Sequence, residues 1–201
     1  MVGLAVFAAL LVVGAALLVP KVVDDLADDD GSAVAGGTEQ GTEEGTGGSG
    51  LDGLLVVPDL SPLHRDDVDI DYEQVPPVGG PHDPEWLACG AFDEPVRDEN
   101  AVHDLEHGTV WITYDPDLPA ADVSALESAL PDDGILSPYP DLPAPVVVTV
   151  WGVQLRLSGA DDPNLPLFIE EYGDGGTAPE PMASCEGGTD DPQGGSGGVP
   201  V

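Results

Sequence analysis

The pattern of apolar and polar residues separates the chain into four parts, and the first part is an uncharged apolar run. Residues 3–19 consist only of Gly, Leu, Ala, Val and Phe. As an α-helix this run would extend over about 25 Å, close to the lower limit for crossing a bilayer. We therefore predict one transmembrane anchor over residues 1–23. A cleaved signal peptide is the alternative, although no small-x-small cleavage site follows Val19.

Two further parts are polar and poor in side chains that form a core. Residues 24–53 are rich in Asp, Glu, Gly and Thr, and such a segment buries too little apolar surface to offset its ordering entropy. We predict a disordered acidic linker there, extended by repulsion between its carboxylates. Residues 187–201 have the same character and predict a disordered tail. The fourth part, residues 54–186, has the size of one domain, about 130 residues.

Apolar and alternating runs within this domain predict the strands of a sheet. The run 54–58 is suited to an edge strand, and the alternation of apolar and acidic residues over 68–72 is typical of a half-buried strand. β-Branched and aromatic residues predict strands over 109–114 and 146–151. The second of these is apolar enough to be a central strand that is covered on both faces.

Two weaker patterns complete the predicted sheet. Residues 135–137 predict a short strand. Gly152 indicates a bulge, after which apolar residues alternate with Gln154 and Arg156 over residues 153–157. This alternation predicts a strand that is covered on one face only.

Three segments have the residue spacing and the end signals of helices. Residues 99–107 predict a short helix that ends at Gly108. Asp117 predicts the cap of a second helix, and Asp162 followed by Pro163 predicts the start of a third. The buried stripes are expected to be Val123, Leu126 and Leu130 in the second helix, and Leu165, Phe168, Ile169 and Tyr172 in the third. The order of elements predicts an α+β domain with a mostly antiparallel sheet and two to three helices.

The charge balance excludes one class of partner. The chain has 4 Lys+Arg against 39 Asp+Glu, and its formal net charge is -35. Phosphate backbones are bound by clustered Lys and Arg, so we expect no nucleic-acid partner. An anionic membrane surface would also repel the chain, and contact with a membrane is expected only through the N-terminal helix. The sequence does not identify a protein partner.

The two cysteines indicate the compartment. Cys89 and Cys185 lie on either side of the expected core, and an even pair in an exported chain favours a disulfide over two thiolate ligands. We therefore expect the N-terminus inside the cell and the domain outside the cytoplasm, in a single-pass protein of the cell membrane. The disulfide would connect the histidine-bearing half of the domain to its C-terminal part.

Histidines and a glutamate form the main candidate site. His103 and His107 lie four residues apart on the predicted helix, with Glu106 beside them, and His82 lies on a loop rich in Pro and Gly. Imidazoles in such an arrangement predict a transition-metal site, for copper or zinc. The competing interpretation is that one histidine packs or caps and the other lies on the surface. His64, in an acidic loop, is expected to be a surface residue.

The run His103-Asp104-Leu105-Glu106-His107 also matches the pattern H-x-x-E-H of inverted zinc peptidases. In a zinc hydrolase both histidines and a distant carboxylate would bind the ion, and Glu106 would be the general base. Glu180 is the candidate for that distant carboxylate. Because Gly108 ends the helix at once and the domain is small, the sequence leaves the question of an enzyme open and favours a non-catalytic role.

The remaining uncommon residues are expected to be structural. Met182 is a candidate soft ligand for copper, but a single methionine is more often a packing residue. The three tryptophans are expected to lie in the core.

Several of these motifs together resemble a bacterial family of membrane-anchored or exported proteins called domain of unknown function 3105. The resemblance extends over residues 68–185 and rests on Gly80-Pro81-His82, on His103-x-Leu105-Glu106-His107-Gly108, on Val150-Trp151-Gly152, on Phe168-Ile169-x-x-Tyr172 and on Pro179-Glu180. It implies one exported domain with His82, His103, Glu106 and His107 as its signature residues, and it implies no activity. Gly79 departs from the family, which usually has Ser at this position.

Three hypotheses follow from the sequence. The first is a membrane-anchored extracytoplasmic domain that binds copper or zinc through His82, His103 and His107, with Glu180 nearby. The second is a zinc hydrolase that uses Glu106 as its base. The third is a non-catalytic structural or interaction module of the cell envelope, in which hydrogen bonds of the histidines stabilise the chain.

Overall fold

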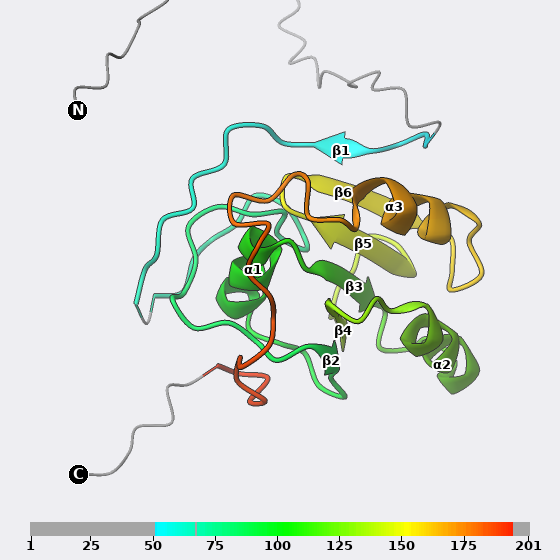
Figure 1. Ribbon diagram of the computed structural model, residues 1–201. Helices are drawn as coiled ribbons and strands as arrows, with labels where there is room; N and C mark the ends of the chain where they lie inside the picture. The colour runs from blue at the N-terminus through cyan, green and yellow to red at the C-terminus, as the bar shows by residue number, and fades with distance from the viewer. Residues whose placement is uncertain (1–50, 67, 195–201) are drawn as a thin grey trace, which may run out of the picture. The chain divides into compact units, whose positions relative to one another are not determined.

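The computed structural model describes residues 51–66 and 68–194 (Figure 1). The predicted anchor, residues 24–50 of the predicted linker, and the end of the tail lie outside the described residues. Within the described ranges no helix is both long and apolar enough to cross a membrane.

The described chain forms a six-stranded sheet and three helices, as expected for an α+β domain. The strands lie in the order β1-β6-β5-β3-β4-β2. The strands are β1 (Leu55–Val56), β2 (Gly90–Ala91), β3 (Val110–Tyr114), β4 (Gly134–Pro138), β5 (Val146–Val150) and β6 (Val153–Leu157), and the helices are α1 (Asp98–His107), α2 (Ala120–Ala129) and α3 (Asn164–Tyr172).

The sheet is mixed, and the prediction of a mostly antiparallel sheet is confirmed only in part, for three of its five strand pairs. The pairs β1·β6, β6·β5 and β5·β3 are antiparallel, whereas β3·β4 and β4·β2 are parallel. The physical reason is the crossover through α2, because a helix between two neighbouring strands returns the chain to run parallel to the first strand. The short strand β2 pairs in parallel with β4 and forms the edge of the sheet opposite β1.

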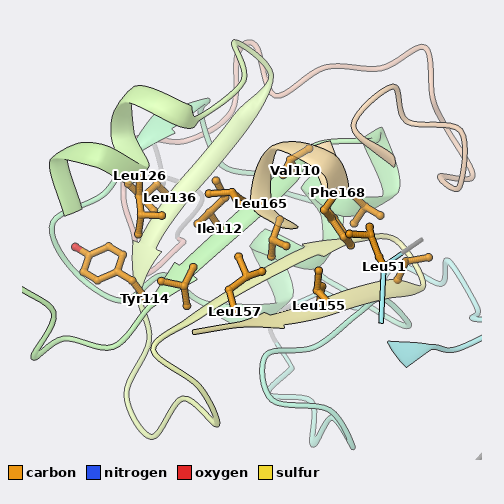
Figure 2. Close-up of a cluster of buried hydrophobic side chains, with 14 residues drawn as sticks. Leu51, Val110, Ile112, Tyr114, Leu126, Leu136, Leu155, Leu157, Leu165 and Phe168 are labelled. Carbon is orange, nitrogen blue, oxygen red and sulfur yellow. The ribbon is translucent and has the colours of Figure 1, made fainter. Parts of the chain in front are cut away.

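One face of the sheet is covered by α2 and α3 and carries a cluster of buried hydrophobic side chains. Ile112 of β3, Leu155 of β6 and Phe168 of α3 belong to its cluster of buried side chains (Figure 2). Leu126 is the only buried residue of α2, while Val123 and Leu130 pack against the cluster as partly buried neighbours. The stripes predicted for the second and third helices are therefore confirmed.

The opposite face is covered by α1 and by long loops, and it combines apolar and polar side chains. Leu105 of α1, Trp111 of β3 and Trp151 belong to its apolar cluster. Polar residues of the strands are buried beside them: the indole N–H of Trp111 donates to Ser137 Oγ at 3.1 Å, and the Gln154 amide donates to the carbonyl of Pro76 at 2.9 Å. Gln154 is 1% exposed, whereas Arg156 is exposed. The prediction that β6 is covered on one face only is therefore confirmed at Arg156 and wrong at Gln154.

Helix α1 ends as the sequence predicted. Gly108 has a φ of 96°, and its N–H bonds to the carbonyls of Asp104 and Leu105. Glycine reaches this left-handed conformation without the penalty of a Cβ. Nearly all of α1 is buried, including its polar residues, because loops cover the side that faces away from the sheet.

Two predicted helix and strand signals were wrong. Asp117 does not cap α2, which begins after Pro119 without a side-chain cap; instead the N–H of Asp117 bonds to Asp115 in the preceding turn. Residues 68–72 form no strand. The N–H of Ile70 donates to the Glu99 carboxylate at 2.6 Å, so a side chain of α1 takes the place of a neighbouring strand as the acceptor. The alternation therefore marks a half-buried loop segment.

Gly152 lies in a turn and not in a bulge. The pairing of Val150 with Val153 leaves Trp151 and Gly152 as the two-residue connection of a β5–β6 hairpin, and Gly152 has a φ of 73°. Such hairpin turns need positive φ, which explains the glycine. The N–H of Gly152 donates to the carbonyl of Val78 at 2.6 Å, which fastens the loop before His82 to this turn.

The disulfide between Cys89 and Cys185 is confirmed, with a separation of 96 residues along the chain. Packed structure also continues past residue 186, where a loose tail was predicted. Thr189 forms a bridge with Leu87, and the N–H of Arg97 donates to the carbonyl of Pro192 at 2.7 Å. Backbone pairing therefore holds residues 187–194 against the body even though their composition is polar.

Candidate metal centre

The site lies on the α1 face, where α1 and two loop segments meet. His103 and Glu106 lie on α1, whereas His64 and His82 come from two segments paired by an isolated parallel bridge. In this bridge the N–H of Arg65 donates to the carbonyl of His82, and the N–H of His82 donates to the carbonyl of Leu63. The pairing fixes the two loop histidines opposite the helix.

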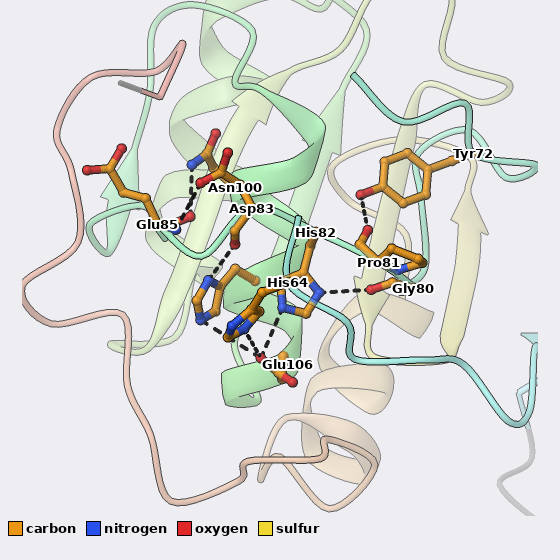
Figure 3. Close-up of polar contacts among 10 residues, drawn as sticks. His64, Tyr72, Gly80, Pro81, His82, Asp83, Glu85, Asn100 and Glu106 are labelled. Atoms are coloured by element: carbon orange, nitrogen blue, oxygen red, sulfur yellow. Dashed lines mark hydrogen bonds and ion pairs between the residues drawn. The ribbon is translucent and has the colours of Figure 1, made fainter. Parts of the chain in front are cut away.

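Three imidazoles surround one oxygen of a buried carboxylate (Figure 3). Glu106 Oε2 lies 3.0 Å from Nε2 of His82, 3.3 Å from Nε2 of His64 and 3.8 Å from Nε2 of His103. The centroids of the three rings are 4.8, 4.8 and 4.9 Å apart. The rings therefore form a nearly regular triangle around the glutamate oxygen, and we refer to these four residues as the His₃Glu cluster.

Backbone carbonyls determine which ring nitrogens face the centre. His82 Nδ1 lies 2.8 Å from the carbonyl oxygen of Gly80, and His103 Nδ1 lies 2.7 Å from that of Asp83. A carbonyl only accepts, so both Nδ1 atoms carry the proton. In the neutral imidazole Nε2 then has a free lone pair, and both lone pairs point towards Glu106.

Electrostatics keeps these two rings neutral. Burial, together with the neighbouring imidazoles, lowers the pKa of His103 to about 3, against the effect of its backbone hydrogen bond to Asp83. Burial also lowers the pKa of His82, although the Gly80 carbonyl and Glu106 act in the opposite direction. Neutral lone pairs of two rings and a carboxylate oxygen thus face one another, an arrangement of acceptors that favours a cation between them.

His64 is the site residue that the sequence analysis missed. We expected a surface residue, and 48% of its side chain is indeed exposed. Its Nε2 nevertheless lies within the His₃Glu cluster. Nothing in the surrounding acidic loop indicates this role; the usable signal was the scarcity of histidine, since the whole chain has only 4.

His107 and Glu180 lie beside the cluster and not in it. Together with Glu106 they form a second group of possible ligands, in which the donor atoms are within 4.8 Å of one another. The His103 and His107 rings are in edge contact, with centroids 4.5 Å apart. The two histidines of the H-x-x-E-H pattern thus belong to different groups, and Glu106 belongs to both.

Two of the expected structural residues differ from prediction. Trp111 and Trp151 lie in the core, but Trp86 is only partly buried and packs against the rings of His103 and His107, with centroids 5.4 and 5.2 Å apart. Met182, which we expected to pack, is 96% exposed.

Gly79 shows why this loop follows a particular path. It has a φ of 135°, and a Cβ there would lie 2.9 Å from Leu60 Cδ1 and 3.0 Å from the Trp151 ring. A serine at this position would require both neighbours to move. The close contact, together with the hydrogen bond of the Tyr72 hydroxyl to the carbonyl of Pro81 at 2.6 Å, holds the loop that ends in His82.

The fold and the site define a class of protein: an α+β domain with a buried cluster of histidines and a glutamate on the α1 face of its sheet. Residues 64–187 match a family described as a protein of unknown function, DUF3105. The match covers more than half of the chain, so this protein belongs to that family, as the sequence motifs indicated. No curated protein and no solved structure matches the chain.

Proposed function

We propose that this domain binds one divalent transition-metal ion, zinc or copper, through His64, His82, His103 and Glu106. The observation that carries the proposal is the convergence of three Nε2 atoms on one carboxylate oxygen. His64 replaces His107 in the ligand set that the sequence suggested, because His107 lies in the neighbouring group.

The spacing of the donor atoms supports this proposal. Ligand atoms bound to a tetrahedral zinc ion at about 2.0–2.1 Å lie about 3.3–3.4 Å from one another. The three distances from Glu106 Oε2 are 3.0, 3.3 and 3.8 Å, on both sides of that value. An ion could therefore enter between the donors with small side-chain movements.

The surroundings of the ligands also suit a metal. Histidines that bind metals usually donate their other ring N–H to a carbonyl or a carboxylate, as His82 and His103 do here. The donors are three nitrogens and one oxygen, without a thiolate or thioether. Such a set suits Zn(II) and Cu(II) better than Cu(I), which prefers sulfur.

The location is part of the proposal. The domain would lie outside the cytoplasm, held to the membrane by the N-terminal apolar helix. Support comes from the disulfide, because structural disulfides persist in oxidising compartments, and from the uncharged run of residues 3–19. A chain with net charge -35 would also attract cations from solution.

The zinc-hydrolase alternative is less well supported. That mechanism needs both histidines of the H-x-x-E-H pattern on one ion and Glu106 free to act as the base. In the structure His103 and His107 are in separate groups, and Glu106 Oε2 occupies the position of a ligand. A non-catalytic module stabilised by hydrogen bonds remains the main competitor, and it predicts no metal.

The test is metal binding by the full chain, purified in detergent without a histidine tag. Elemental analysis and calorimetric titration should show Zn(II) or Cu(II) bound to the protein, and His64→Ala should weaken binding by at least about 10-fold. Arg65→Ala is the matched control, since it changes the next residue outside the cluster. The proposal is wrong if neither ion binds at neutral pH.

A further inference from the structure

Glu106 presents its two oxygens differently. Oε2 faces His64, His82 and His103, whereas Oε1 takes part in no hydrogen bond or ion pair within residues 51–66 and 68–194. The carboxylate also has His107 and Glu180 as neighbours, with one donor atom of each residue within 4.8 Å of the others. One carboxylate thus belongs to two sets of donors.

His107 is the independent sign that the second set has a ligand. The residue is 7% exposed, and its Nδ1 is buried without a hydrogen-bond partner in the described part of the chain. A buried polar atom without a partner is costly and calls for an explanation. Imidazole nitrogen is a common ligand of transition metals, and an ion bound at Nδ1 would provide the missing interaction.

The chain holds Glu180 next to this histidine. The N–H of Glu180 donates to the carbonyl of Glu106 at 3.0 Å, so the segment is fastened to the last turn of α1. Gly108 and Gly175 permit this close approach, since a Cβ on Gly108 would lie 3.0 Å from Gly175 Cα. The Cys89–Cys185 disulfide anchors the same segment five residues beyond Glu180.

We propose a second cation site formed by Glu106, His107 and Glu180, so that the Glu106 carboxylate bridges two ions. This inference rests on the proposed function, because the first ion is the one held by the His₃Glu cluster. In two-metal sites the ions lie about 3.5–4 Å apart, a spacing that one bridging carboxylate can span. The exposed Glu180 leaves room for water to complete the coordination, so the second ion would be the more weakly held and the more accessible.

The donors need little movement to reach an ion. Atoms that are 4.8 Å apart at most lie within about 1 Å of the positions required for bonds of about 2.0–2.2 Å. Glu180 is exposed and able to rotate, so most of this movement falls on a flexible side chain. One nitrogen and two carboxylates suit Zn(II) or another divalent ion of similar preference.

The experiment is a zinc titration of the full chain followed by native mass spectrometry and calorimetry. Two ions per chain are expected, the second at least about 10-fold weaker than the first. Glu180→Gln should remove the second ion and retain the first, and His107→Ala should do the same. Glu186→Gln, a nearby exposed carboxylate outside both groups, is the matched control and should retain both ions.

The possible outcomes separate the two proposals. A wild-type chain that binds one ion, with an affinity that Glu180→Gln leaves unchanged, overturns the second site and supports the first. A chain that binds no ion overturns the proposed function, and the second site with it. Since Glu180 is exposed, its variant retains the fold even if the buried His107→Ala variant does not, and the test remains decisive.

Discussion

The two faces of the sheet are built in different ways. On the α2 and α3 face, hydrophobic side chains of regular elements pack together, among them Ile112, Leu155 and Phe168. On the α1 face, loops bring histidines and carboxylates under cover, and backbone carbonyls hold the rings in place. The difference teaches that one side of the sheet supplies packing alone, whereas the other side combines packing, the disulfide and the candidate site.

Removal of the disulfide is expected to have the largest effect. The bridge closes 96 residues, for which the loop-entropy model gives about 4–5 kcal/mol of stability. Cys89→Ala with Cys185→Ala should lower the free energy of unfolding by about that amount in a denaturant titration. Hydrogen exchange should rise first in residues 178–194 of the α1 face, while α3 stays protected. Loss of protection in α3 first would contradict the division between faces.

Truncation of Phe168 should destabilise the apolar face without affecting the site. Phe168 is fully buried between α3 and the sheet, and Phe→Ala in a core costs about 3–5 kcal/mol. The measurement is chemical unfolding of the metal-free protein, with zinc affinity measured under native conditions. We expect the loss of stability and an affinity within about 2-fold of wild type, the scatter typical of distant sites. Leu167→Ala, at an exposed position of the same helix, is the control.

Glu106→Gln should have the converse effect to truncation of Phe168: weaker zinc binding without a loss of stability. The variant keeps the shape of the side chain but removes the negative charge at the centre of the His₃Glu cluster. Zinc affinity should fall on the order of 100-fold or more, since even residues that only support metal ligands affect affinity by 10–100-fold. The melting temperature of the metal-free protein should not fall, because the amide N–H₂ can donate to the Nε2 lone pairs. A large drop in melting temperature with no change in metal binding would favour a purely structural cluster.

Acid should weaken the metal-free protein through His103. The pKa of His103 is about 3 in the fold against about 6.5 in the unfolded chain, so between these values only the unfolded state takes up the proton. Stability contributed by this residue therefore falls as the pH falls from about 6.5 towards 3. Between pH 7 and pH 4, the free energy of unfolding measured by denaturant titration should fall less for His103→Gln than for wild type.

Asp98 provides the opposite control for that experiment. Burial and the neighbouring Glu99 raise its pKa to about 6, against the hydrogen bond from Tyr139. Here the folded state takes up the proton first, so acidification from about 6 towards 3.8 adds stability. In Asp98→Asn the free energy of unfolding should therefore fall more between pH 7 and pH 4 than in wild type. The same direction of change in both variants would contradict these protonation states.

Much of the apolar face could be predicted from the sequence, because periodicity reports burial. The stripe through Leu165 and Phe168 and the run at Val146–Val150 are confirmed as a buried helix face and a central strand. Strand direction could not be predicted, because it depends on where the crossover through α2 returns. Asp117 failed as a cap because α2 begins only after Pro119, so Asp117 lies two residues before the N-cap position.

The site was predictable only where its residues share one helix. His103 and Glu106 are three residues apart on α1, so their proximity follows from helical geometry. His64 joins them through a two-residue bridge between loops, a tertiary contact that leaves no local pattern. His107 was placed with His103 because the two are four residues apart on the same helix. The direction of each ring, however, depends on Trp86 and on the loops that cover α1.

The disulfide described above also determines what a single cut in the backbone would do. Every ligand candidate on α1, together with Glu180, lies inside the covalent ring closed by Cys89 and Cys185. A protease that cleaves an exposed loop once within this ring, such as that around Asp141, leaves both fragments joined. The fragments stay at high effective concentration, and the donors of both proposed sites remain on one molecule.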